Sequence, residues 1–99
     1  MFTYTEFKRS LKEAKVGQCV VYYSARPGGS LATQRLWDDT LDRIAKLAFC
    51  LSELGYVRLC QRKTLTGTDY EIYIKRKLIK AGSSEEGPIT EAERLATTL

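Results

Sequence analysis

One alternating stretch, residues 55–80, restricts the fold of this chain more than any other part. Two runs in which apolar and polar residues alternate, 56–63 and 69–77, flank a short segment that contains Gly67. Alternation with a period of two is typical of antiparallel strands that bury one face. Glycine supplies the positive φ that a short hairpin loop often needs. The sequence therefore predicts a β-hairpin with one apolar face and one basic face.

A helix and a strand are predicted ahead of this hairpin. Thr3 and Glu6 have the spacing of a capping box, which predicts a helix that begins at about residue 4 and ends at Gly17. Residues 18–23 carry no charge and include two valines and two tyrosines. This composition predicts a strand that is buried on much of both faces.

Residues 31–54 have helical periodicity and are followed by Gly55, a typical helix stop. Two interpretations fit this segment equally. A short helix at 31–36 could precede a longer helix that begins at Asp38 or Asp39, whose carboxylates would complement the helix dipole. A single continuous helix is the alternative.

The predicted order of elements is α-β-α(α)-β-β. Three strands of this kind can form one antiparallel sheet with the helices on one face, so the expected class is α+β. A small winged-helix-like domain has this order, and its wing would be the basic C-terminal hairpin. Other small α+β folds share the same order.

Charge divides the chain into two parts. Residues 1–80, the predicted single domain, carry 15 Lys and Arg against 8 Asp and Glu, whereas residues 81–99 carry Arg94 against four glutamates. A basic body indicates a polyanionic partner. The acidic tail is predicted to be flexible. Thr90 and Glu93 offer a second capping box, so a short helix and a disordered segment both fit its end.

The residue types do not favour catalysis or metal binding. The chain has no histidine, and its three cysteines, Cys19, Cys50 and Cys60, have no metal-ligand spacing. We expect buried, reduced thiols, no cofactor, no metal and no enzymatic activity. No apolar run is long enough to span a bilayer, and no signal pattern is present, so a cytoplasmic protein without membrane contact is expected.

The basic face of the hairpin and the first helix are the candidate nucleic-acid contacts. Their Lys and Arg side chains would meet phosphates, and a tyrosine would stack or hydrogen-bond. The predicted contact residues are Lys8, Lys12, Arg58, Arg62, Lys63, Tyr73, Lys75, Arg76 and Lys77. The alternative is a solvated edge, because exposed strands also carry Lys and Arg to prevent edge pairing.

The second candidate surface lies at residues 37–42. Asp38, Asp39 and Asp42 would repel phosphate at the start of the long helix, where a DNA-reading helix usually carries polar and basic side chains. With Trp37 they form a candidate protein interface. Trp37 itself is expected in the core, and an exposed interface anchor is the alternative.

Four segments of the sequence resemble small uncharacterised proteins encoded by bacteriophages and prophages of alphaproteobacteria. These segments are residues 17–23, 31–35, 48–62 and 70–76. The resemblance implies a phage-type accessory protein without an established activity, and it brings no catalytic residues.

The expected function is therefore that of a non-enzymatic accessory protein that binds nucleic acid through the basic hairpin and the first helix. The alternative is a protein-interaction module, such as an anti-CRISPR-like phage inhibitor of a defence complex in the host cytoplasm. A homodimer that pairs exposed strand edges is a third alternative.

Overall fold

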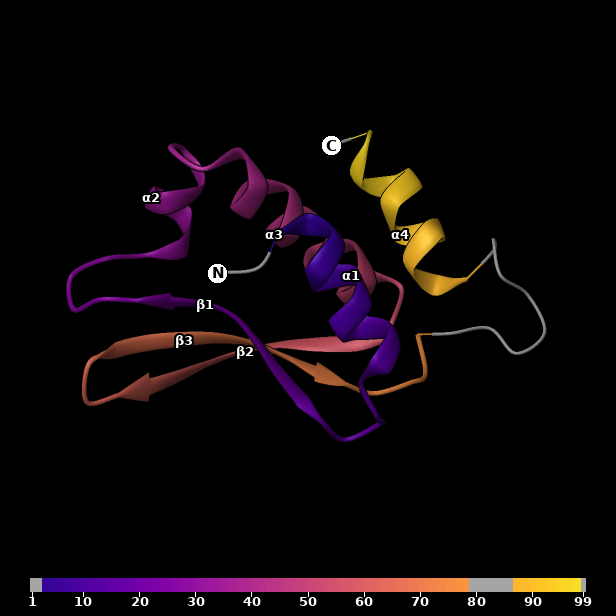
Figure 1. The fold of residues 1–99 in the computed structure, drawn as a ribbon, viewed down its shortest axis with the longest axis horizontal. Helices are drawn as coiled ribbons and strands as arrows, with labels where there is room; N and C mark the ends of the chain where they lie inside the picture. Colours follow the sequence, from indigo (N-terminus) through magenta and orange to yellow (C-terminus); the bar gives the residue numbers. More distant parts are fainter. Residues whose placement is uncertain (1–2, 79–86, 99) are drawn as a thin grey trace.

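A computed structural model describes residues 3–78 and 87–98, which form four helices and three strands. The elements in chain order are α1 (Tyr4–Glu13), β1 (Cys19–Ala25), α2 (Leu31–Arg35), α3 (Asp39–Glu53), β2 (Val57–Thr64), β3 (Gly67–Ile74) and α4 (Pro88–Ala96). All four helices lie on one side of a three-stranded antiparallel sheet (Figure 1). The α+β class and the sheet predicted from the sequence are thus confirmed.

The hairpin strand β3 occupies the middle of the sheet, in the order β1-β3-β2. One face of the sheet packs against the helices and the other faces away from every described helix (Figure 1). The prediction that the first strand is buried on both faces is therefore wrong. Val20 and Tyr22 are buried in β1, whereas Cys19 and Val21 are exposed. The expectation of three buried thiols is also wrong, because Cys19 lies on this open face and is exposed. Cys50 is buried and Cys60 is half-buried.

The helix α1 begins where the sequence predicts but ends earlier than predicted. The side chain of Thr3 accepts a hydrogen bond from the N–H of Glu6, and the Glu6 carboxylate accepts one from the N–H of Thr3. The helix ends at Glu13 rather than at Gly17. Gly17 instead lies in the turn before β1, with φ 91°, and donates its N–H to the carbonyl of Ile74 at 2.8 Å.

The helical segment after β1 is broken, so the two-helix interpretation is correct. Ser30 caps α2, and the Asp38 carboxylate caps α3 by accepting a hydrogen bond from the N–H of Leu41 at 3.0 Å. Trp37 lies in the break and is 81% exposed. The expectation that it is in the core is wrong, because the connection between two capped helices runs over the surface.

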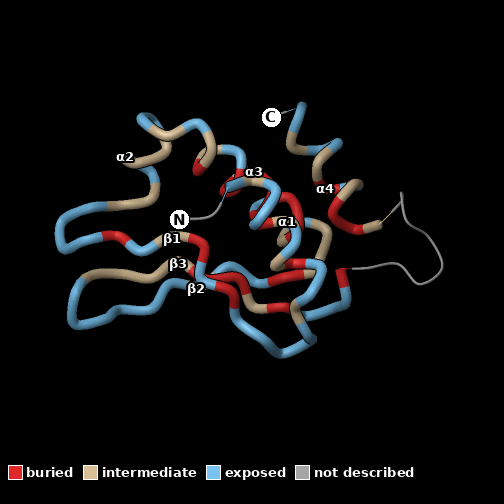
Figure 2. The backbone as a smooth tube through the Cα atoms, in the orientation of Figure 1, coloured by how far each residue is buried: buried red, intermediate tan, exposed pale blue. Residues whose placement is uncertain are grey.

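The core lies between the sheet and the inner faces of α1, α3 and α4 (Figure 2). Its largest fully buried side chains are Phe7, Leu11, Leu41, Ile44, Leu47, Leu51, Ile72 and Ile74. The helix α3 supplies half of these, so it is the central helix of the fold.

The described part of the acidic tail forms α4, whose Ile89 and Ala92 are buried in the same core. The predicted capping box at Thr90 and Glu93 does not cap this helix, because the helix begins one turn earlier, after Gly87. Glu93 instead faces α1, where it accepts a hydrogen bond from the Tyr4 hydroxyl. Residues 81–86, predicted to be flexible, lie outside the described residues.

Candidate nucleic-acid interface

The hairpin register separates cations that the sequence places on one basic face. Val57 pairs with Ile74 at the base of the hairpin, and Thr64 pairs with Gly67 at its tip. Residues 75–77 follow β3 and therefore lie at the base, whereas Arg62 and Lys63 lie near the tip. At about 3.4 Å per residue, Val57 and Arg62 are about 17 Å apart along β2. The hairpin cations thus form two groups rather than one.

The end of α1 joins the group at the base. The N–H of Ile74 donates to the carbonyl of Gln18 at 2.9 Å, and the N–H of Gly17 donates to the carbonyl of Ile74 at 2.8 Å. These two bonds hold the α1–β1 turn beside the exit of β3, and Figure 1 shows both segments at the same end of the molecule. Lys12 and Lys15, at the end of α1, are therefore brought to the cations that follow β3.

We call this cluster the basic end. Its residues are Lys12, Lys15, Arg58, Lys75, Arg76 and Lys77. All six are exposed, and none forms an ion pair with another described residue. Glu13 is a neighbouring carboxylate in α1. The basic end is thus a surface of strong positive charge whose cations are available to an anion.

Tyr73 belongs to the same end, on the open face of the sheet. It pairs with Arg58 across the hairpin and with Cys19 of β1. The Arg58 guanidinium carbon lies 5.8 Å from the centroid of the Tyr73 ring, within the range of a cation–π contact. Lys75 is two residues further along the chain from Tyr73. An anion bound by Arg58 and Lys75 would therefore lie beside this ring.

Three of the predicted contact residues lie elsewhere. The Lys8 ammonium is 3.4 Å from a Glu93 carboxylate oxygen. Arg62 bridges two carboxylates on the open face, at 3.0 Å from Glu71 and 3.5 Å from Asp69. Lys63 lies at the hairpin tip, where it lines a shallow hollow with Arg26 and Leu65. Partner carboxylates thus offset the charges of Lys8 and Arg62, and distance separates Lys63 from the basic end.

The structure therefore brings together six of the nine predicted contacts and adds Lys15. The sequence shows Lys15 only as one of several helical cations. Lys15 joins the basic end because hydrogen bonds connect residues 17–18 with Ile74, which is far away in the chain. No local pattern reports such a pairing.

The carboxylates of the candidate protein interface at α3 also make contacts within the chain. Asp38 caps the helix, and Asp42 accepts hydrogen bonds from Arg35 at 2.9 Å and Lys46 at 3.1 Å. These two bonds hold the pKa of Asp42 below its ordinary value. Asp39 is exposed in the first turn. These carboxylates stabilise the start of α3, so they have a role without any partner.

Trp37 and its neighbour Leu36 form an apolar corner between α2 and α3. They are 81% and 77% exposed, respectively. Two large apolar side chains exposed side by side in the chain are a candidate contact surface.

Residues 3–78 and 87–98 contain neither a metal-binding cluster nor a membrane-spanning helix. Within them no group of three His, Cys, Asp or Glu side chains could hold a metal ion. No helix of the same segments has the length and apolar character needed to cross a membrane. Comparison of the chain with family models, curated proteins and solved structures finds no match in any of the three.

Proposed function

We propose that the protein is a small, non-enzymatic accessory factor of phage or prophage type that binds the nucleic-acid backbone through its basic end. The observation that carries this proposal is the convergence of six exposed cations from α1, β2 and the segment after β3, together with the turn that follows α1. Several unpaired cations on one surface favour phosphate binding by counterion release.

A winged-helix-like fold is part of this proposal. The strand order β1-β3-β2 and the helices on one face support it. The mode of binding would nevertheless differ from that of a DNA-reading winged helix. The hairpin tip carries few unpaired cations, and Asp38 and Asp39 at the start of α3 would repel phosphate. Backbone contact without base reading is therefore expected.

A salt titration with matched double variants tests this function. Binding of labelled random-sequence duplex DNA is followed by fluorescence anisotropy from low to high salt. Lys75→Gln with Lys77→Gln should weaken binding and reduce the slope of log affinity against log salt by about 2. Arg26→Gln with Lys63→Gln removes the same charge from the hollow beside the hairpin tip and should leave that slope unchanged. Equal losses in the two variants would count against the basic end, and absence of binding at low salt would refute the function.

A second candidate function is protein binding, for example as an anti-CRISPR-like inhibitor of a host defence complex. The exposed Leu36 and Trp37 favour it, because aromatic anchors are enriched at protein interfaces. Pull-down from nuclease-treated host lysate distinguishes the two functions. A protein complex lost with Trp37→Ser, but kept when Lys75 and Lys77 are replaced, would favour protein binding.

A further inference from the structure

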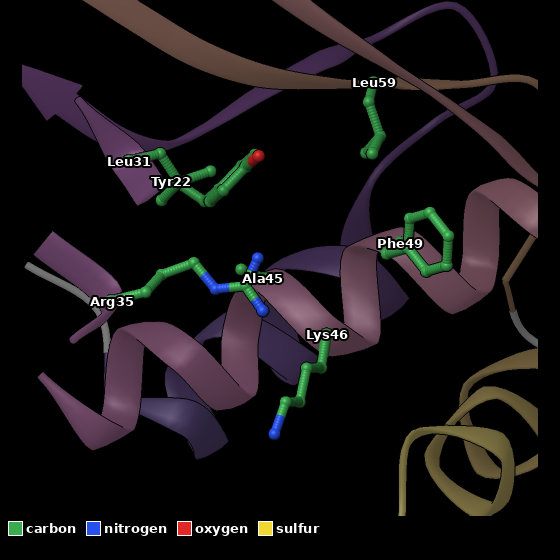
Figure 3. Close-up of a pocket in the computed structure, with 7 residues that line it drawn as sticks. All are labelled: Tyr22, Leu31, Arg35, Ala45, Lys46, Phe49 and Leu59. Carbon is green, nitrogen blue, oxygen red and sulfur yellow. The ribbon is translucent and has the colours of Figure 1, made fainter. Parts of the chain in front are cut away.

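A groove runs between α3 and the helix side of the sheet, and it is distinct from the basic end. Its volume is about 350 Å³. The residues that line it are Tyr22, Leu31, Arg35, Ala45, Lys46, Phe49 and Leu59. Figure 3 shows the sheet residues Tyr22 and Leu59 on one side and the α3 residues on the other.

The groove exposes large apolar side chains toward solvent. Phe49 of α3 is 46% exposed and Leu59 of β2 is 37% exposed, whereas Tyr22 and Ala45 beneath them are buried. Leu59 pairs with the fully buried Ile72 and therefore points to the helix side of the sheet. A partner that fills the space between Phe49 and Leu59 would remove both from water, which is favourable.

The strand beside this groove has a free edge. β2 pairs only with β3 in the order β1-β3-β2, so alternate backbone groups of β2 have no strand partner among the described residues. An extended peptide can add to such an edge as a further strand. Its side chains would then alternate between the groove and the open face of the sheet.

Charge indicates which kind of strand would fit. β2 carries Arg58, Arg62 and Lys63 and no carboxylate. Pairing two copies of β2 would bring these cations together, which disfavours a second copy of the chain as the occupant. On the groove side, Arg35 and Lys46 share the single carboxylate of Asp42. Arg58 on the open face forms no ion pair with a described residue, whereas Arg62 is paired with Asp69 and Glu71. Arg58, together with the excess positive charge of Arg35 and Lys46 at the groove, therefore favours an acidic partner.

We propose that the β2 edge and this groove bind an extended, acidic segment of another protein, in which apolar and acidic residues alternate. The apolar side chains enter the groove between Phe49 and Leu59. The acidic side chains lie on the open face, beside Arg58, because Asp69 and Glu71 already pair with Arg62. This site shares Arg58 with the basic end but does not depend on nucleic-acid binding there, and its test uses Phe49 and Leu59, which lie outside that end.

The test is a binding titration with defined peptides. The probe is a short, fluorescein-labelled peptide of alternating valine and glutamate. Two control peptides replace glutamate by lysine, or keep the composition but separate the two residue types into blocks. Fluorescence anisotropy at fixed ionic strength should show binding of the alternating acidic peptide and much weaker binding of both controls.

Variants of the protein locate the site. Phe49→Ala and Leu59→Thr should each weaken binding by about fivefold or more. Leu95→Ala is the matched control, because Leu95 is 42% exposed on α4 and does not line the groove. Circular dichroism confirms that each variant is folded.

Three outcomes would overturn the proposal. They are no binding of the alternating acidic peptide, equal binding of the block peptide, or equal affinity in the Phe49 and Leu59 variants. Light scattering across a concentration series provides an independent check. A dimer that is lost on Phe49→Ala would assign the groove to a second copy of the chain instead.

Discussion

At the scale of single residues, Gly67 is where backbone geometry restricts the sequence most. It opens β3 with φ 143°, in the left-handed half of conformational space that favours glycine. A β-carbon at this position would overlap the carbonyl oxygen of Ala25, where the end of β1 approaches the hairpin tip. Both the conformation and the contact therefore require a residue without a side chain.

Replacing Gly67 by alanine should lower the free energy of unfolding by about 3 kcal/mol or more, because strain and overlap act together. Gly28→Ala is the matched control. Gly28 has φ 83°, but a β-carbon added there would meet no atom within 4 Å, so only the strain of about 1–2 kcal/mol is expected. Urea denaturation followed by circular dichroism measures both. Equal losses would show that the approach of Ala25 is unimportant.

Trp37 provides a second prediction at this scale, because it is the only tryptophan in the chain. Its 81% exposure predicts emission close to that of the unfolded protein, and efficient quenching by both acrylamide and iodide. Fluorescence of the free protein measures this directly. Emission shifted to shorter wavelength, with protection from iodide, would contradict the exposed corner between α2 and α3.

At the scale of elements, α4 is attached by two different kinds of contact. Ile89 and Ala92 are buried in the core. On the neighbouring face, the Tyr4 hydroxyl donates to Glu93 at 3.0 Å and the Lys8 ammonium lies 3.4 Å from the same carboxylate. The Lys8 and Glu93 side chains remain 28% and 31% exposed, so their ion pair is screened by solvent. Apolar burial should therefore dominate the attachment.

Ile89→Ala should reduce the free energy of unfolding by about 2–4 kcal/mol, the usual cost of a large-to-small change in a core. Glu93→Gln should cost less than about 1 kcal/mol, because it removes a partly exposed ion pair. Leu95→Ala, on the exposed side of the same helix, controls for helix propensity. Thermal and urea denaturation measure all three. A larger loss of unfolding free energy for Glu93→Gln than for Ile89→Ala would contradict the dominance of apolar burial in the attachment of α4.

Local patterns predicted the elements well and their mutual arrangement less well. The Thr3 capping box and the Asp38 cap depend on neighbours within three residues, so the sequence shows them directly. The register of β2 and β3 decides that the hairpin cations form two groups. The hydrogen bonds between residues 17–18 and Ile74 decide that Lys15 lies in the basic end. Composition describes charge along the chain, but hydrogen bonds between distant segments decide which charges meet.

At the scale of the whole molecule, two tyrosines link its layers. Tyr4 joins α1 to α4 through Glu93, and the Arg43 guanidinium carbon of α3 lies 4.1 Å from its ring centroid. Tyr22 packs from β1 against Phe7 of α1, with ring centroids 6.1 Å apart. Burial, the larger cause, raises the pKa of each phenol to about 12, and for Tyr4 the hydrogen bond to Glu93 adds to the effect.

These phenols predict a loss of stability at alkaline pH. Both ionise near pH 10 in the unfolded chain and near pH 12 in the folded protein, so the unfolded state loses its protons first. The free energy of unfolding should be unaffected by these groups below about pH 9 and fall between about pH 10 and 12. Urea denaturation across this range measures the fall, which Tyr4→Phe and Tyr22→Phe should each make shallower. An unchanged slope in both variants would refute the assignment.

The central place of β3 also has a consequence for synthesis on the ribosome. β1 emerges early, yet among the described residues it pairs only with β3, the third strand to be made, in the register that sets Cys19 opposite Tyr73. Until β3 emerges, β1 has no pairing edge within the described chain, whereas α2 and α3 can form locally. Such long-range closure slows folding and leaves a nascent strand open to wrong pairing. Ribosome-bound chains that stop before residue 67 should therefore lack the sheet and be cleaved readily by protease at β1.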